Sequence, residues 1–172
     1  MRFRLRAAAV LAAASVLLLT ACSSDVQQES TVSDSTISSV FDFTASTVSG
    51  SDFVGADLVG QPVVLWFWAN WCTICRAESP AVAEIAAEFD GRVSFVGIAG
   101  RGPREDMAAF VEETGTGGFT QLADVDGSVW LRFGIIVQPS FVFVMPDGEM
   151  QVFSGSLGAQ ELKDAADQLL AG

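Results

Sequence analysis

The feature that most constrains this chain is a pair of cysteines, Cys72 and Cys75, placed where an apolar run ends and a helical pattern begins. The run, residues 63–68, reads Val-Val-Leu-Trp-Phe-Trp and is typical of a strand buried on both faces. A thiol at the first turn of a helix lies beside free backbone N–H groups and the positive end of the helix dipole, which favour its thiolate. Because the thiolate attacks disulfides, the pair predicts a dithiol/disulfide redox centre.

A zinc site and a purely structural disulfide are the alternatives to a redox centre. Structural zinc takes four ligands from Cys, His and carboxylates, but the chain has no His and only one further cysteine, Cys22. A C-x-x-C beside a βαβ pattern therefore favours redox chemistry, with no metal and no external cofactor. A structural disulfide stays open, although so short a loop gains little stability in the chain-entropy account.

The N-terminus has the pattern of an export signal. Three arginines within the first six residues precede an apolar block, residues 7–19, which is too short to span a bilayer comfortably. We therefore expect residues 1–21 to be a signal peptide that is removed.

The end of this signal, Leu-Thr-Ala-Cys at residues 19–22, resembles the lipobox of bacterial lipoproteins. The resemblance implies that Cys22 carries a lipid, becomes the mature N-terminus and holds the protein on the outer side of a membrane. The alternative is a plain secretory leader, with Cys22 as a free thiol. Either way we expect the protein to act outside the cytoplasm, in the cell envelope.

The remaining chain divides into a polar segment and one domain. Residues 22–40 are rich in Ser, Thr, Asp and Gln and are expected to form a flexible tether. Residues 41–172 have the length of a single domain. Without the signal peptide, six basic residues stand against twenty-one acidic ones, a net charge of −15. Such a surface repels phosphate backbones, so nucleic-acid binding is not expected.

The hydrophobic pattern predicts an α/β domain. Strands are expected near residues 62–68 and 93–98, with helices following at about 76–89 and around 107–111. This alternation implies parallel strands joined by a right-handed crossover. Residues 141–145 and 150–153 flank Pro-Asp-Gly and predict an antiparallel hairpin, and an amphipathic helix covers 162–170. Alternation that begins at residues 40–43 suggests one more strand.

Residues 67–76, Phe-Trp-Ala-Asn-Trp-Cys-Thr-Ile-Cys-Arg, resemble the signature of thioredoxin-fold proteins. More narrowly, the chain is similar to the extracytoplasmic TlpA, ResA and DsbE-like oxidoreductases, including lipoproteins of the secreted DsbE/DsbF type, from about residue 41 to the C-terminus. The resemblance implies a thioredoxin fold: a mixed central sheet flanked by helices, with an extra N-terminal strand or hairpin.

The resemblance also implies roles for particular residues. Cys72 would be the nucleophile and Cys75 the resolving thiol, close enough to release the client from a mixed disulfide. Trp71 would shape the client-binding surface, although it could equally be an ordinary exposed aromatic. The bond between Gln138 and Pro139 would be cis and would turn the backbone of residue 138 toward Cys72, where an extended client segment could pair with it.

Three further positions, one match and two that concern a departure, bear on this resemblance. Pro80 matches the proline that kinks the first helix of thioredoxins, although the helix could also end there. Thioredoxins have a buried acid in the strand before the motif, where this chain has Trp66. Glu78 is the candidate to accept the proton of Cys75 in its place, and the alternative is an acid that is merely solvated on a helix face.

The expected function is a thiol-disulfide oxidoreductase of exported cysteine-containing proteins, monomeric and recycled by a membrane redox partner. A reduction potential of about −120 mV would indicate a disulfide-forming oxidase and about −270 mV a thioredoxin-like reductase, for example of cytochrome c maturation. The residues between the cysteines do not decide the direction. Val-Gln-Pro-Ser at 137–140 and the following Phe-Val-Phe resemble the secreted oxidases more and favour that direction.

Two other functions are compatible with the same fold. Copper-handling members pair a C-x-x-x-C with a His, and both are missing from this sequence, so copper would have to bind the two thiols alone. Peroxidases of this fold use a lone peroxidatic cysteine in another sequence context. Metal titration of the reduced protein and a peroxide-consumption assay would separate these alternatives from disulfide exchange.

Overall fold

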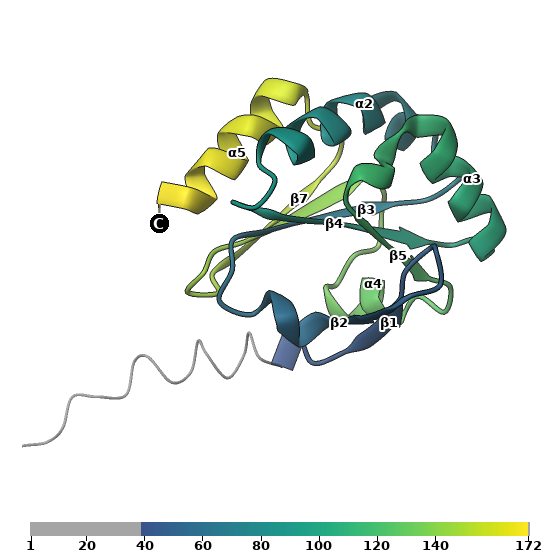
Figure 1. Ribbon diagram of the computed structural model, residues 1–172, viewed down its shortest axis with the longest axis horizontal. Helices are drawn as coiled ribbons and strands as arrows, with labels where there is room; N and C mark the ends of the chain where they lie inside the picture. Colours follow the sequence, from purple (N-terminus) through teal and green to yellow (C-terminus); the bar gives the residue numbers. More distant parts are fainter. Residues whose placement is uncertain (1–38, 172) are drawn as a thin grey trace, which may run out of the picture.

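The computed structural model describes residues 39–171, and their centre is a sheet of five strands in the order β5-β4-β3-β6-β7 (Figure 1). The sheet is mixed, because β3, β4 and β5 run parallel while β6 is antiparallel to both β3 and β7. The strands are β3 (Val63–Trp68), β4 (Ser94–Gly100), β5 (Thr120–Asp124), β6 (Ser140–Val144) and β7 (Met150–Ser154).

Strand β3 lies in the middle of this sheet and separates two apolar cores. Every residue of the strand is buried. Successive side chains of a strand point to opposite faces, so Val64, Trp66 and Trp68 pack in one core and the three residues that alternate with them pack in the other. The uninterrupted apolar run is therefore explained by a strand that is covered on both sides.

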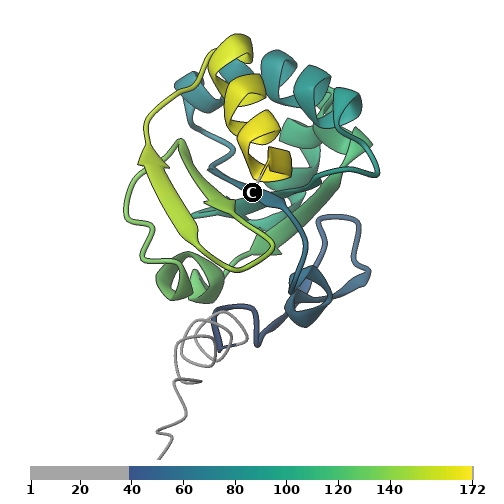
Figure 2. The same ribbon diagram turned by 90° about the vertical axis from the view of Figure 1, so that its left-hand side faces the viewer.

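Three helices cover the face of the sheet toward which Trp66 points: α2 (Thr73–Glu88), α3 (Arg104–Thr114) and α5 (Ala159–Ala171) (Figure 1). The 3-10 turn η2 (Thr116–Gly118) joins α3 to β5. Figure 2 shows the other face, where the short helix α4 (Ser128–Arg132) and the N-terminal segment lie. That segment consists of the hairpin β1 (Thr44–Ser46) and β2 (Asp52–Val54), followed by the 3-10 turn η1 (Gly55–Leu58).

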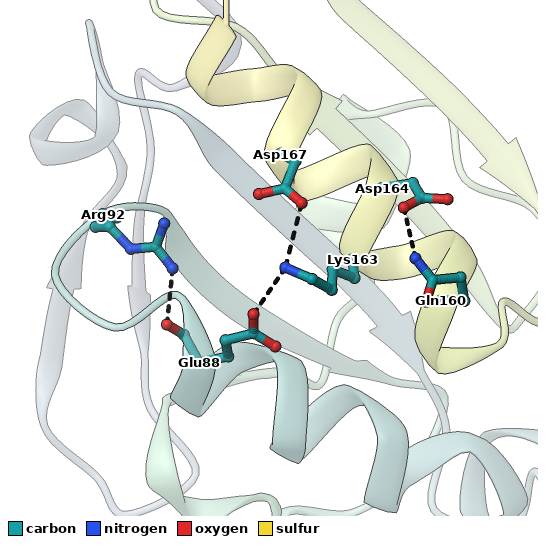
Figure 3. A network of polar contacts seen from close by, with 6 residues as sticks. All are labelled: Glu88, Arg92, Gln160, Lys163, Asp164 and Asp167. Atoms are coloured by element: carbon teal, nitrogen blue, oxygen red, sulfur yellow. Dashed lines mark hydrogen bonds and ion pairs between the residues drawn. The ribbon is translucent and has the colours of Figure 1, made fainter.

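The C-terminal end of α2 is tied to α5 by a polar network (Figure 3). Lys163 on α5 contacts Glu88 on α2 at 2.7 Å and Asp167 at 3.2 Å. Arg92 donates to the backbone oxygen of Glu88 and stacks its guanidinium on the Phe89 ring. These exposed pairs add little stability, and the packing of α2 and α5 rests on the apolar core beneath them.

The structure confirms the predicted α/β fold, including the mixed sheet and the extra N-terminal hairpin. Helix α2 continues through Pro80 to Glu88, as the helical pattern predicted, and the alternative that the helix ends at Pro80 is wrong. The boundary of the N-terminal strand was predicted incorrectly, because this strand begins at Thr44 and not at residue 40. Strand β5 and helix α4 were not predicted. The predicted signal peptide, Cys22 and almost all of the predicted tether lie outside the described residues.

Candidate redox site

The Cys72–Cys75 disulfide lies where β3 leads into α2. The two sulfur atoms are bonded, and the Cα atoms are 5.3 Å apart. Cys72 is the N-cap residue of α2: its Sγ accepts the backbone N–H of Cys75 at 3.1 Å, and its backbone oxygen accepts the N–H of Arg76. Cys72 keeps 6% of its surface exposed, whereas Cys75 is fully buried. The helix terminus thus supplies the free N–H that the sequence pattern predicts.

The segment that carries Pro139 reaches the same end of the sheet. Ser140, the first residue of β6, pairs with Phe67 near the end of β3, so the two residues before it lie at the end where β3 passes into the cysteine motif. The Gln138–Pro139 bond is cis. Four large apolar side chains of the two segments are exposed: Trp71, Ile74, Ile136 and Val137.

Trp71 is held in place although more than half of its side chain is exposed. Its Nε1 donates a hydrogen bond at 3.1 Å to the backbone oxygen of Arg101, in the loop between β4 and α3. Arg101 was not among the residues selected from the sequence. The only local signal for it is its position between two glycines directly after a buried strand, which marks a loop and not a function.

Glu78 occupies the interior beneath the disulfide and is not solvated. Only 5% of its surface is exposed, and its Oε1 accepts a hydrogen bond from Trp66 Nε1 at 2.7 Å. Trp66 stands where thioredoxins have their buried acid. In this chain, the carboxyl group of Glu78 on α2 therefore binds the indole of Trp66 on β3.

The environment of this carboxyl group favours its neutral form. Burial raises the pKa of Glu78, and contacts from Ser156, Trp66 and the backbone of Leu157 offset part of that rise. Oε2 is buried without a partner of hydrogen-bond geometry among residues 39–171. Glu78 lies three residues after Cys75 on α2, a spacing that places the two side chains on neighbouring positions of one helix face.

Other features of residues 39–171 do not form a competing site. No group of three or more His, Cys, Asp or Glu in this part of the chain is placed to hold a metal ion. Asp124 is buried, but its two oxygens accept the backbone N–H groups of Val129 and Trp130 at the start of α4. A surface hollow of about 1300 Å³ adjoins Arg92 and the first residues of β4 and β5, at the opposite end of the sheet from the disulfide.

Comparison with known proteins identifies relatives of this chain in sequence and in structure. The chain is 40% identical over 129 residues to the soluble secreted antigen MPT53 of Mycobacterium tuberculosis, covering 75% of this chain and 73% of that protein. It is 31% identical over 110 residues to the thiol-disulfide oxidoreductase ResA of Oceanobacillus iheyensis, covering 63% and 57%. The solved structure of MTB dsbF superposes with a TM-score of 0.73 at 44% identity, covering 76% of this chain and 96% of that one.

The fold and the cysteine pair at the start of α2 define a thioredoxin-like thiol-disulfide oxidoreductase. The AhpC/TSA family model matches residues 38–153, and the chain belongs to this family. The resemblance inferred from residues 67–76 is thereby confirmed, as is the assignment of the chain as an oxidoreductase.

The raised pKa of Glu78 predicts how stability depends on pH. Between the ordinary glutamate pKa near 4.5 and the raised value, the folded chain holds this proton more tightly than the unfolded chain, so the free energy of unfolding falls as pH rises. In Glu78→Gln an uncharged amide still accepts the Trp66 N–H. Denaturant unfolding of the oxidised protein should therefore show the variant more stable than wild type at pH 8, with the difference shrinking toward pH 4.

Glu113→Gln is the matched control for this experiment. Glu113 is an exposed acid on α3 that pairs with Arg76, so its replacement should not produce the same pH-dependent gain. If Glu78→Gln were less stable than wild type by the same amount at pH 4 and pH 8, the charged form of Glu78 would not be disfavoured by burial.

Proposed function

We propose that this protein forms disulfides in exported, cysteine-containing proteins through the Cys72–Cys75 pair. The observation that carries the proposal is the asymmetry of the pair. Cys72 keeps 6% of its surface exposed and its Sγ accepts a backbone N–H at the start of α2, whereas Cys75 has no exposed surface. A client can therefore reach the sulfur of Cys72 but not the sulfur of Cys75.

In the forming direction, a client thiolate attacks Cys72 Sγ and breaks the Cys72–Cys75 bond. The electron pair of that bond goes to Cys75, and a mixed disulfide joins Cys72 to the client. The second client thiolate then attacks the client sulfur of this mixed disulfide and displaces Cys72 as a thiolate, which the Cys75 N–H and the helix terminus stabilise. Two electrons pass from the client to the pair, which ends as a dithiol.

Glu78 is proposed to act as the general acid and base that exchanges a proton with Cys75. A buried thiolate at Cys75 is unfavourable, because burial disfavours the charged form. Burial raises the pKa of Glu78, which makes its carboxyl group a better proton carrier than an exposed glutamate; the proposed role is to pass a proton to the Cys75 sulfur during client oxidation and to take it back in the reverse reaction. The support for this role is the position of Glu78, buried on α2 three residues after Cys75.

Clients are proposed to bind to the apolar surface around the disulfide. Trp71 and Ile74 come from the cysteine motif, and Ile136 and Val137 from the segment before Gln138 and Pro139. Exposed apolar side chains beside an accessible backbone suit an extended, unfolded peptide better than a small polar molecule. Gln138 is the proposed partner of that peptide's backbone. Pro139 would orient Gln138, because Pro139 has no N–H and its carbonyl oxygen accepts the N–H of Gly155.

The relatives support action outside the cytoplasm, and that compartment favours the forming direction. A solved structure at 39% identity, covering 76% of this chain, is titled a secreted Mycobacterium tuberculosis disulfide oxidoreductase homologous to E. coli DsbE. Exported chains emerge with reduced cysteines, so an enzyme in that compartment meets dithiol substrates. Repeated turnover then requires an oxidant for the pair, and a membrane redox partner is the proposed source.

The protein is proposed to be held at the membrane by a lipid on Cys22, as a monomer. Among residues 39–171, no helix combines the length and apolar character needed to cross a bilayer. The support for the anchor is therefore the sequence Leu-Thr-Ala-Cys at the end of the signal. With residues 22–40 as a tether, the domain would remain free to meet clients near the membrane.

The lipid anchor predicts how the full-length protein partitions. When expressed in a lipoprotein-processing bacterium, wild type should enter the detergent phase of a Triton X-114 extraction, whereas Cys22→Ser should stay in the aqueous phase or the medium. Acyl chains account for this difference, since each buried methylene contributes about 0.8 kcal/mol. Wild type in the aqueous phase would instead support a plain secretory leader.

The catalytic roles predict opposite phenotypes for the two cysteines. In an assay that follows recovery of activity by reduced RNase A, wild type should accelerate disulfide formation and Cys72→Ser should have no activity above background. Mixed with disulfide-bonded RNase A, Cys75→Ser should accumulate a mixed disulfide between Cys72 and the client, visible by non-reducing mass spectrometry, because the Cys72 thiolate attacks the client disulfide and no Cys75 thiol displaces the client. Full exchange by Cys72→Ser would overturn the roles, and faster reduction of insulin than oxidation of RNase A would reverse the proposed direction.

A further inference from the structure

Arg101, in the loop between β4 and α3, contacts both segments that flank the disulfide. Its backbone oxygen accepts a hydrogen bond from Trp71 Nε1 at 3.1 Å, and its Nη2 donates to the backbone oxygen of Ile136 at 2.6 Å. Trp71 directly precedes Cys72, and Ile136 stands two residues before Gln138. One residue thus connects the segment before the attacking sulfur to the segment that ends in the cis-proline.

The guanidinium group of Arg101 stacks on the buried ring of Trp130. Its carbon lies 5.1 Å from the centre of the Trp130 ring, close enough for a cation–π interaction. Trp130 is buried, and its own Nε1 donates to the backbone oxygen of Ile98 in β4. The planar guanidinium can stack on this ring while its N–H groups reach the Ile136 oxygen, a combination that lysine does not reproduce.

The backbone at Arg101 is also constrained. Its φ is +61°, the one positive value of a non-glycine residue among residues 39–171. A residue with a Cβ atom keeps this unfavourable conformation only where its surroundings fix it. The next residue, Gly102, abuts the same motif, because a Cβ atom there would lie 2.3 Å from Asn70 Oδ1. The two loops are therefore packed against each other at neighbouring residues.

We propose that Arg101 is a positioning residue: it holds the Trp71 indole and segment 134–138 in the arrangement that receives a client protein. The inference deepens the proposed exchange with proteins and rests on it. Arg101 does not act on the sulfur atoms, so its loss should weaken client docking and leave the intrinsic reactivity of the disulfide unchanged. The expected signature is a higher KM for a protein client with little change in kcat.

The test compares Arg101→Ala with Arg92→Ala. Arg92 makes the same kinds of contact, one hydrogen bond to a backbone oxygen and one stacked ring, at the far end of α2. With reduced RNase A as client, Arg101→Ala should lower kcat/KM roughly tenfold, mostly through KM, because small displacements of a docking surface cost this much. The rate of disulfide reduction by dithiothreitol should stay within about twofold, and Arg92→Ala should match wild type in both assays.

Arg101→Gly separates positioning from stability. Glycine adopts the positive φ freely, so this variant should unfold no more easily than Arg101→Ala, yet it lacks the guanidinium and should show the same rise in KM. Equal kcat/KM for Arg101→Ala and Arg92→Ala would overturn the proposal. An equal loss with RNase A and with dithiothreitol would also overturn it, because the defect would then lie in the disulfide.

A second readout does not depend on protein clients. Amide hydrogen exchange in residues 134–138 should become faster in Arg101→Ala and Arg101→Gly and stay unchanged in Arg92→Ala. If wild type reacted with dithiothreitol but not with RNase A, the proposed function would fail, and faster exchange in this segment would still support the positioning role. Unchanged exchange in both Arg101 variants would contradict that role whatever the client assay showed.

Discussion

The hydrogen bond from the Cys75 backbone N–H to Cys72 Sγ is the contact on which the redox site depends. It exists because α2 begins at Thr73, one short loop after the buried strand β3, and uses the sulfur atom of Cys72 as its N-cap. An N-cap group normally satisfies one of the free N–H groups of a helix, and in the proposed reaction the same N–H would stabilise negative charge on Cys72 Sγ once the disulfide opens. The start of the helix and the chemistry of the site thus follow from one contact.

The sheet beneath the site explains why the second cysteine can stay hidden. Trp66 and Trp68 from β3 pack with Phe110 of α3 under the first turns of α2. Within this apolar layer, Glu78 is the acid nearest to Cys75 along α2, and its contact with the Trp66 indole holds one oxygen in place. The helix thereby supplies a buried carboxyl group to the indole of the central strand.

The strands and helices with long, regular patterns were predictable from the sequence, because β3 and the residues 141–153 are apolar or alternate over their whole length. Strand β5 was not predicted, because its five residues combine polar and apolar side chains without a regular alternation. They form a strand by pairing with β4. Cys72 and Cys75 were predictable because their chemistry depends on local spacing. The partner of Glu78 and both contacts of Arg101 were not, since they join residues twelve to thirty-five positions apart across different elements.

The ionisation of the reduced pair tests the central claim most directly. Thiolate absorbance of the reduced protein should be titrated between pH 3 and pH 10, and Cys75→Ser should be titrated in parallel to assign the signal to Cys72. The account predicts that Cys72 ionises below the usual cysteine pKa of about 8.5, while Cys75 stays protonated to higher pH. If Cys72 ionised at 8.5 or above, α2 would not activate its sulfur and the account would be contradicted.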